Sequence, residues 1–375
     1  MRVLMLSGGA AMLDASSAVA KRMIEYGRTF GELDILLLLG EREKKGVTRM
    51  SHVTIYPVYG KFSRFWKGYA LGKKLMQQAR YDVITAQDAE RALIAWLLSR
   101  KFKVPWQMQI HADIFSPHFA RHSLYDRARA RLAKFLVPRA HGVRVVSERI
   151  KESILALGIL DEQRATSNIT VLPIFLDAAK IRNAPIQTDL REKYPGRFII
   201  LAPCRLTKEK NVGMAVEAMR RLVADGKAGN ALLLIVGRGP ERDALERQVK
   251  SGNLRAHVIF EDWTDDMPSY YKTADVYLLT SVYEGGARSP LEALAAGLPV
   301  VMTDVAPAKE DIIDGHNGIV VPVGDSKELA RQLGELISSK EKLAKLKKGA
   351  AASLRSPISK EDYLALYKKL LTDLL

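Results

Sequence analysis

The sequence predicts an α/β protein built from two tandem Rossmann-like, doubly wound parallel sheets. First, 375 residues are too many for one core of ordinary size and suit two domains. Second, apolar strands and amphipathic helices alternate along the chain, the pattern of a parallel sheet covered on both faces. Third, the alternation restarts after segment 177–196, which contains two prolines and no sustained apolar period. We interpret that segment as an interdomain hinge.

The expected elements follow from the apolar runs. In the first half, strands are expected near 2–7, 33–39, 82–85, 105–110, 143–147 and 169–175. The helices between them are expected near 15–26, 62–79, 89–100, 123–136 and 148–157. In the second half, strands are expected near 198–204, 231–237, 257–260, 275–280, 299–303 and 318–323. Helices separate these strands. We expect two such domains in tandem to place the carboxyl ends of their sheets facing each other across a cleft. Ligands of open α/β sheets bind at those ends.

Composition excludes several classes of protein. With 47% hydrophobic and 27% charged residues, the chain is not disordered. One cysteine, Cys204, excludes an internal disulfide framework and a cysteine metal cluster. The N-terminal apolar run breaks at Ser7, which makes it a poor signal peptide, and no run approaches the roughly 18 apolar residues of a membrane span. We expect a cytoplasmic protein that is not integral to a membrane.

The net charge of +16 is concentrated in the first half of the chain. Residues 1–180 carry 29 Lys/Arg against 16 Asp/Glu, whereas residues 181–375 carry 29 against 26. An anionic partner is therefore expected on the first half. Nucleic-acid binding is one class that such charge favours, but no helix-turn-helix, RNA-binding or zinc pattern accompanies it. We expect no nucleic-acid partner.

The stretch SVYEGGARSPLEALAAGLPVV, at 281–301, admits a structural and a functional interpretation. Structurally, Ser289 suits a helix N-cap, Pro290 the first helical position, and Glu292 a capping box. Gly297 would end the helix. This leaves the preceding residues, Glu284 included, without a role.

The functional interpretation explains the preceding residues. Gly285 and Gly286 keep the backbone bare in front of a helix N-terminus, which is an arrangement that binds phosphate. Carboxylates do not bind phosphate, so Glu284 and Glu292 are expected to accept hydrogen bonds from neutral hydroxyls such as those of sugars.

Two further stretches carry polar or glycine residues after predicted strands. In APCRLTKEKNV, Arg205 follows a strand and Lys210 precedes a helix, where a lysine opposes the macrodipole unless an anion binds. Two solvated loop charges are the alternative. In LLIVGRGPER, Gly237 and Gly239 lack the third glycine of a dinucleotide fingerprint.

Together these stretches resemble the donor domain of the retaining GT-B glycosyltransferases of the family 4 type, glycosyl transferases group 1. The resemblance is carried by RLTKEKNV, LLIVGRGPER, FEDW, YYKTADVYLLTSVYEGGARSPLEALAAGLPVV and DIIDGHNGIVVPVGD, in that order over roughly 198–335. The first half matches more loosely, through SGG, QIHADIF, VVSERIKESI and ITVLPIFLD. Two departures are Glu261, where the family has a glycine, and Ile174–Asp177, where it has an asparagine-glycine turn.

The resemblance implies a role for each matching residue. Arg205 and Lys210 would hold the donor diphosphate, Glu284 would contact the hydroxyls of the transferred sugar, and His111 would lie near its reactive face. Glu292 would hold the ribose hydroxyls. The other residues implied to bind the donor are Gly8, Gly9, Gly237, Asp262, Trp263, Gly285, Gly286, Ala287 and Arg288. For His111, a structural role is the alternative, because the chain has seven histidines.

The resemblance further implies three regions: an acceptor-side domain at 1–178, a donor-binding domain at 179–355, and a C-terminal helix at 356–375 that could pack back on the first domain. The implied reaction transfers a sugar from a nucleotide-diphosphate-sugar to a glycan or lipid-linked acceptor with retention, in polysaccharide or glycolipid biosynthesis. The nucleotide-sugar is a substrate, so no cofactor is expected. No Asp-x-Asp pair is present, so we expect no metal. A nucleotide-sugar epimerase on the same fold is the alternative enzyme.

The segment KFSRFWKGYALGKK, at 61–74, predicts a helix with an aromatic face flanked by basic residues. The aromatic residues recur at helical spacing and are Phe62, Phe65, Trp66 and Tyr69. They could face the core, with solvated lysines beside them. They could instead dock on an anionic membrane surface, making the protein peripheral on the inner membrane face.

Overall fold

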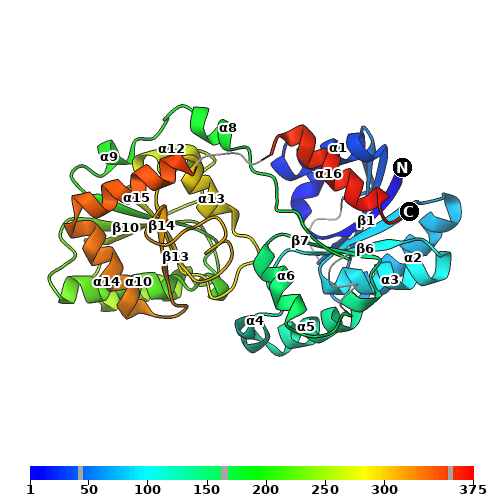
Figure 1. Cartoon of the computed structure of the whole chain (residues 1–375), viewed down its shortest axis with the longest axis horizontal. Helices are drawn as coiled ribbons and strands as arrows, with labels where there is room; N and C mark the ends of the chain where they lie inside the picture. The colour runs from blue at the N-terminus through cyan, green and yellow to red at the C-terminus, as the bar shows by residue number, and fades with distance from the viewer. Residues whose placement is uncertain (41–44, 162–167, 354–357) are drawn as a thin grey trace. The chain divides into compact units, whose positions relative to one another are not determined.

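The computed structural model describes residues 1–40, 45–161, 168–353 and 358–375. The chain divides into two compact units. The first unit comprises Met1–Pro173 together with Ile358–Leu375, and the second comprises Ile174–Pro357. Each unit is a sheet with helices on both faces (Figure 1). The α/β class predicted from the alternation of elements is confirmed, and no helix of the described residues is long and apolar enough to cross a membrane.

The first unit is built on an eight-stranded sheet in which only the edge pair β3 and β4 is antiparallel. Its strands in spatial order are β3 (Thr48–Met50), β4 (Val53–Tyr59), β2 (Glu32–Leu39), β1 (Arg2–Ser7), β5 (Val83–Gln87), β6 (Trp106–Ile110), β7 (Gly142–Val145) and β8 (Ile169–Val171). The sequence did not predict β3 or β4, and the strand expected over 169–175 ends at Val171.

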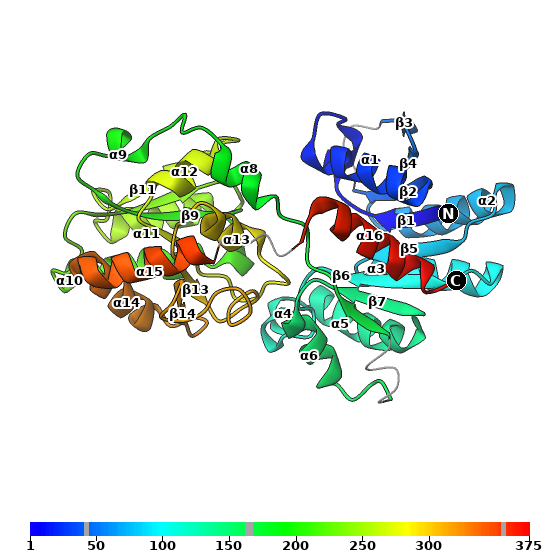
Figure 2. The same ribbon diagram turned by 45° about the horizontal axis from the view of Figure 1, so that its top comes forward.

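Helices of the first unit cover both faces of this sheet. They are η1 (Ala10–Leu13), α1 (Ala18–Phe30), α2 (Ser63–Gln78), α3 (Ala89–Phe102), α4 (Pro117–His122), α5 (Leu124–Leu136), η2 (Val137–Arg139), α6 (Glu148–Leu155) and the C-terminal α16 (Lys360–Thr372). Figure 2 shows α16 lying beside α1.

Polar contacts hold α16 on the first unit. Its Tyr363 hydroxyl accepts a hydrogen bond from the buried Arg144 side chain at 2.9 Å, and Gln109 Nε2 donates to the Tyr367 hydroxyl at 2.6 Å. Lys360 pairs with Glu25 of α1. The last helix of the chain therefore belongs physically to the unit that the first residues build.

The second unit has a six-stranded parallel sheet. Its strands in spatial order are β11 (Val258–Glu261), β10 (Ala231–Val236), β9 (Phe198–Pro203), β12 (Val276–Leu279), β13 (Val300–Thr303) and β14 (Gly318–Val321). The helices are α8 (Ala178–Asn183), α9 (Leu190–Lys193), η3 (Lys208–Lys210), α10 (Val212–Ala224), α11 (Arg242–Ser251), α12 (Met267–Thr273), α13 (Arg288–Ala295), α14 (Ser326–Ser338) and α15 (Lys340–Ala352).

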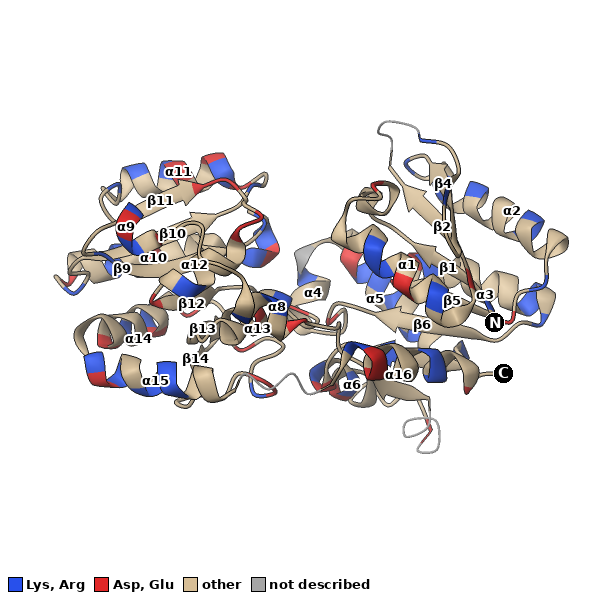
Figure 3. Ribbon diagram, turned by 90° about the horizontal axis from the view of Figure 1, so that it is seen from above, with Lys and Arg blue, Asp and Glu red and all other residues tan. Residues whose placement is uncertain are grey.

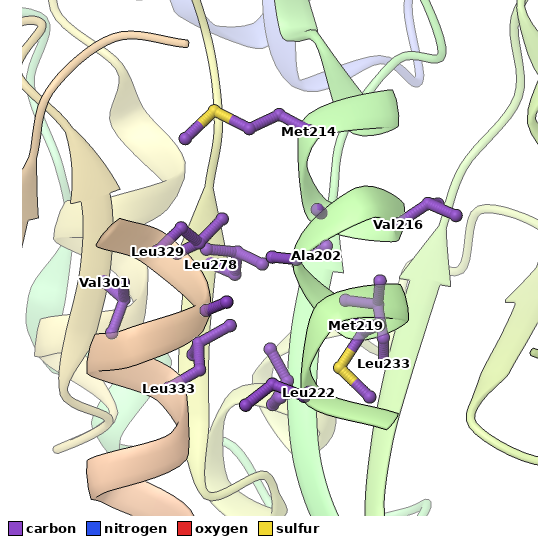
Figure 4. Packing of buried hydrophobic residues seen from close by; sticks show 14 of the residues in the cluster. Ala202, Met214, Val216, Met219, Leu222, Leu233, Leu278, Val301, Leu329 and Leu333 are labelled. Atoms are coloured by element: carbon purple, nitrogen blue, oxygen red, sulfur yellow. The ribbon is translucent and has the colours of Figure 1, made fainter. Parts of the chain in front are cut away.

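Alternate residues of each central strand pack into two cores, one on each face of the sheet. Leu233 packs with Met214 of α10 and Leu329 of α14 in one core, part of which is shown in Figure 4. Leu234, the next residue, packs in the opposite core with Tyr270 of α12. Burial on both faces explains why these strands are continuous apolar runs in the sequence.

The segment interpreted as an interdomain hinge, 177–196, lies within the second unit and is partly helical. It contains α8 and α9, and Ala178 and Ile181 of α8 pack against Ala295 of α13. This packing supplies the apolar burial that so short a helix lacks by itself.

Candidate donor-binding site

Four loops of the second unit bring predicted donor residues to one edge of its sheet. Arg205 follows β9, Gly237 follows β10, Asp262 follows β11 and Glu284 follows β12. Because these strands are parallel and lie in the order β11, β10, β9, β12, their carboxyl ends form one continuous edge.

The centre of this edge is an ion pair between Lys210 and Glu284. Lys210 Nζ donates a hydrogen bond to Glu284 Oε1, and Ser281 Oγ donates to the same oxygen at 2.7 Å. The two charged side chains are only 16% and 13% exposed. The residues predicted to hold the diphosphate and the sugar are therefore in direct contact.

Backbone and side-chain hydrogen bonds fix the segment that carries Lys210. Thr280 Oγ1 donates to the Lys210 carbonyl at 3.0 Å, and Val282 N donates to the Glu209 carbonyl at 2.9 Å. These bonds attach η3 to the end of β12. An anion bound here would meet a preorganised ammonium group, but it must compete with Glu284 for it.

Arg205 is held much more loosely than Lys210. Its side chain is 78% exposed, and its contact with Glu209 is 3.7 Å long. A guanidinium in this situation can turn toward a ligand at little cost, because it gives up only a weak surface ion pair.

The structure corrects the predicted start of α13. The helix begins at Arg288, and its N-cap is Ala287, which makes no side-chain capping bond. Ser289 Oγ instead forms a hydrogen bond of 2.6 Å with the hydroxyl of the buried Tyr277, and Pro290 is the third helical residue. The helix ends before Gly297, as predicted, with φ 79° at that glycine.

Glu292 is consequently free of the capping box proposed for it. Its Oε1 accepts from Arg288 Nε at 2.9 Å, and its Oε2 accepts from the Tyr271 hydroxyl at 3.2 Å. The structural role that competed with ligand binding does not exist in this helix. No sequence pattern linked Tyr271 to Glu292 or Ser281 to Glu284, and these two supporting residues were missed.

Gly237 and Gly239 have a packing role as well as a predicted binding role. A Cβ at Gly237, where φ is 147°, would lie 2.0 Å from the Cys204 carbonyl oxygen. A Cβ at Gly239 would lie 2.2 Å from the Leu206 carbonyl oxygen. Glycine is required at both positions so that the loop after β10 can lie against the loop that carries Arg205.

The segment after β11 divides into a buried anchor and an exposed tip. Glu261 accepts hydrogen bonds from the hydroxyls of Tyr194 and Tyr270 and pairs with Lys193 at 2.6 Å. Burial alone would raise the pKa of Glu261, but these three donors lower it. Asp262 pairs with Arg238 at 2.7 Å, and the indole of Trp263 is left 54% exposed.

The remaining predicted residues lie in the first unit. Gly8 and Gly9 follow β1, and His111 follows β6, so all three lie at the carboxyl edge of that sheet. His111 Nε2 is buried and has no hydrogen-bond partner among the described residues. Burial, with smaller contributions from Arg144 and Arg22, lowers the pKa of His111 to about 3, so the imidazole is neutral at physiological pH.

Two family models match the chain, one on each unit. Residues 187–353 match the family described as glycosyl transferases group 1, and residues 40–172 match the glycosyl transferase 4-like domain. Together the two matches span most of the 375 residues.

Curated relatives match over parts of their lengths. The lipopolysaccharide core biosynthesis glycosyltransferase LpsE of Rhizobium meliloti is 27% identical over 227 residues, which are 59% of this chain and 61% of LpsE. The UDP-Gal:alpha-D-GlcNAc-diphosphoundecaprenol alpha-1,3-galactosyltransferase of Escherichia coli is 22% identical over 265 residues, 67% of this chain and 65% of that protein. The chain thus spans less than two thirds of each of these relatives.

Solved structures share the whole fold. The structure of Anabaena Alr3699/HepE in complex with UDP aligns over 100% of both chains, with a TM-score of 0.76 and 20% sequence identity. At that identity the likeness concerns the fold, which is the GT-B arrangement of two Rossmann-like sheets. By these matches the second unit is similar to the glycosyl transferases group 1 and the first unit to the glycosyl transferase 4-like domain.

Proposed function

We propose that this protein is a retaining glycosyltransferase that moves a sugar from a nucleotide-diphosphate-sugar to a glycan or lipid-linked acceptor. The observation that carries this proposal is the Lys210–Glu284 pair at the carboxyl edge of the second sheet. The pair joins a cation suited to a diphosphate with a carboxylate suited to sugar hydroxyls.

The pair has a specific consequence for donor binding. When the donor diphosphate binds Lys210 and the turned guanidinium of Arg205, the charge of Lys210 is neutralised by phosphate. Glu284 then gives up its cation and gains hydroxyl donors from the transferred sugar, while Ser281 keeps its carboxylate in place. Glu292, fixed by Arg288 and Tyr271, accepts from the ribose hydroxyls. Charge-assisted hydrogen bonds of this kind contribute about 1.5–3 kcal/mol each.

The first experiment is a thermal-shift comparison of UDP-glucose, UDP-galactose, UDP-N-acetylglucosamine and GDP-mannose. One donor should raise the melting temperature, and Arg205→Ala should weaken its binding by about 1.5–3 kcal/mol. Arg220→Ala, which removes an exposed arginine of α10 paired with Glu217, is the matched control. No shift with any nucleotide-sugar would contradict the proposal.

Product analysis distinguishes transfer from the alternative reaction. An NMR spectrum of the product made with the stabilising donor should show the donor's anomeric configuration retained. An epimerase would instead return a nucleotide-sugar with one inverted carbon and no new glycosidic bond.

The proposed neutralisation of the diphosphate by Arg205 and Lys210 requires no metal ion. Turnover should therefore continue in excess EDTA. Loss of turnover that magnesium or manganese restores would contradict this part of the proposal.

The acceptor class is supported by the relatives and by helix α2. LpsE is named for lipopolysaccharide core biosynthesis, and the E. coli galactosyltransferase is named for alpha-D-GlcNAc-diphosphoundecaprenol. On α2, the buried face comprises Gly68, Gly72, Leu75 and Met76. Phe62 and Trp66 are 73% and 79% exposed, so the expectation that the aromatic face packs into the core is wrong for these two residues.

We further propose that α2 docks on an anionic membrane surface, where lipid-linked acceptors are found. Residues 45–81 contain eight Lys or Arg and no Asp or Glu, and Figure 3 shows α2 carrying basic residues without acidic ones. Each basic residue near such a surface contributes about 1 kcal/mol, and exposed aromatic rings add apolar burial.

Vesicle co-sedimentation tests the docking of α2. Binding should require anionic lipid, weaken with salt, and fall when Lys61, Arg64 and Lys67 are changed together to glutamine. The control changes Lys340, Lys345 and Lys348 of α15 to glutamine, which removes the same charge from the second unit. Equal binding of both variants, or equal binding to neutral and anionic vesicles, would exclude this surface.

A further inference from the structure

Asp88 occupies a backbone conformation that an aspartate rarely adopts. It lies between β5 and α3 with φ 65° and ψ 163°, in a region open mainly to glycine. Asp88 is the N-cap residue of α3, yet its side chain makes no capping hydrogen bond. Its carboxylate pairs instead with Arg91 NH1 at 3.1 Å and stays one-third exposed. An aspartate at a helix N-cap ordinarily accepts a hydrogen bond from the first turn of the helix. The strained backbone of Asp88 does not produce such a bond.

The neighbours of Asp88 are the residues predicted to meet the substrates. Its N–H donates to the Gln109 carbonyl at 3.1 Å, two residues before His111. On the other side, β5 pairs with β1, which ends at Ser7 before Gly8. The carboxyl ends of three adjacent strands thus bring Gly8, Asp88 and His111 to the same part of one edge.

Arg91 connects two of these residues. A Cβ added at Gly8 would lie 2.0 Å from Arg91 NH2, so the guanidinium lies directly against the loop after β1. The same guanidinium holds Asp88 through NH1. Arg91 therefore positions the carboxylate relative to the glycine loop.

The other acidic side chain at the start of α3, Glu90, has one oxygen engaged, and its second oxygen, Oε2, is buried without a partner among the described residues. Glu90 Oε1 accepts from the Tyr125 hydroxyl at 2.6 Å and pairs with Arg129 Nε at 2.9 Å. Of these two carboxylates, Asp88 is the more exposed, at 33% against 16%. It is the one that can accept a hydrogen bond from a ligand at this edge.

We propose that Asp88 is a substrate-binding residue of the transfer reaction, whose carboxylate accepts a hydrogen bond from the attacking hydroxyl of the acceptor sugar and orients it. This inference rests on the proposed function. Arg91 acts as a positioning residue, and the strained backbone at Asp88 is retained because an unstrained residue would direct the carboxylate into the cap of α3. The bond orients a neutral hydroxyl and assigns no proton transfer to Asp88.

Two variants separate this role from a structural one. Asp88→Asn keeps the size and the backbone but makes a weaker acceptor. With the donor that stabilises the protein most and octyl β-glucoside as acceptor, kcat should fall about tenfold or more, because misorientation of a reactant is costly. The KM for octyl β-glucoside should change less than kcat, and the dissociation constant of the donor should not change.

Asp88→Gly removes the carboxylate and relieves the backbone. The melting temperature should rise, because glycine adopts this conformation without strain, while transfer to octyl β-glucoside should fall as in Asp88→Asn. Lys103→Gly is the matched control. It relieves a positive φ of 57° at the other end of α3, and it should raise the melting temperature without lowering transfer.

Either of two results would overturn the inference. One is an unchanged kcat for octyl β-glucoside in Asp88→Asn. The other is a lower melting temperature for Asp88→Gly than for the unmodified protein, since Asp88 would then be needed for the fold. A failure of the proposed function is distinguishable, because it would appear as absent donor binding in the unmodified protein.

Discussion

The two sheets present ionisable groups at their carboxyl edges in opposite ways. In the second unit, charged groups are already matched: Lys210 with Glu284, Arg288 with Glu292, and Lys193 with Glu261. In the first unit, His111 Nε2 is buried without a partner among the described residues, and Asp88 is held by one arginine in a strained conformation.

The difference shows how each edge is expected to respond to a ligand. A matched edge is stable without substrate, and an incoming anion exchanges one ion pair for another. The first edge is costly without substrate, because His111 Nε2 is buried without a partner among the described residues and the backbone of Asp88 is strained. Variants that remove one member of an ion pair should therefore lower the free energy of unfolding most in the second unit. In the first unit, the free energy of unfolding should depend on pH.

The largest effect is expected where a matched pair is broken. Lys210→Ala leaves the Glu284 carboxylate buried without its cation, and the free energy of unfolding should fall by about 3 kcal/mol. Adding Glu284→Gln should recover part of that loss, because the buried charge is then removed. Urea denaturation of both variants measures this effect. Lys208→Ala, an exposed lysine on the same η3 turn, is the control, and equal stability of Lys210→Ala and Lys208→Ala would show that the pair contributes nothing.

Lys210 and Glu284 also show what could be predicted from the sequence. Both residues were predicted as site residues, Glu284 because it follows an apolar strand and Lys210 because it precedes a helix, and the family resemblance implied their roles. Their direct contact was not predicted, since 74 positions separate them and only the β9–β12 pairing brings them together. The supporting hydroxyls of Ser281 and Tyr271 were missed for the same reason.

The fold was predictable where burial on two faces produces continuous apolar runs. Strand β4 was missed because its sequence VTIYPVY contains Pro57, which argues against a strand within a sheet. Strand β3 has only three residues. The helices α8 and α9 are too short to show a period, and α8 depends on α13 for its apolar contacts.

A smaller effect is expected from the unmatched histidine, and it should depend on pH. The pKa of His111 is about 3 in the folded protein and about 6.5 in the unfolded chain. Between these values the unfolded chain binds a proton that the folded protein does not, so stability is complete above pH 6.5 and is lost as pH falls. From pH 7 to pH 5 the loss should be about 2 kcal/mol.

Urea denaturation at these two pH values should show a shallower loss for His111→Gln than for the unmodified protein. His118→Gln, which changes an exposed histidine nearby, should leave the pH dependence unaltered. If His111→Gln and His118→Gln lose the same free energy of unfolding between pH 7 and pH 5, His111 is not a buried histidine without a partner.

Glu292 tests a matched pair at the surface, where binding and stability should separate. Glu292→Gln should weaken nucleotide binding by about 1.5 kcal/mol, because a neutral amide accepts from ribose hydroxyls less well than a carboxylate. Its free energy of unfolding should change by about 0.5 kcal/mol or less, since the Arg288 partner is 44% exposed and α13 has no side-chain cap to lose. Titration calorimetry and urea denaturation measure the two quantities, and unchanged nucleotide affinity would remove Glu292 from the site.

The smallest effect sharpens the comparison at the start of α13, where Ser289 was predicted to cap a helix and instead binds Tyr277. Ser289→Ala should cost about 1 kcal/mol of stability, because the buried Tyr277 hydroxyl loses its 2.6 Å partner. A lost N-cap would cost a similar amount, so this variant alone does not separate the two roles. Adding Tyr277→Phe does separate them. If the hydroxyl pair matters, the double variant should be more stable than Ser289→Ala, since neither polar group is then left unsatisfied. If Ser289 capped the helix, adding Tyr277→Phe would restore no stability. The Ser289–Tyr277 hydrogen bond would then not count among the paired groups of the second unit.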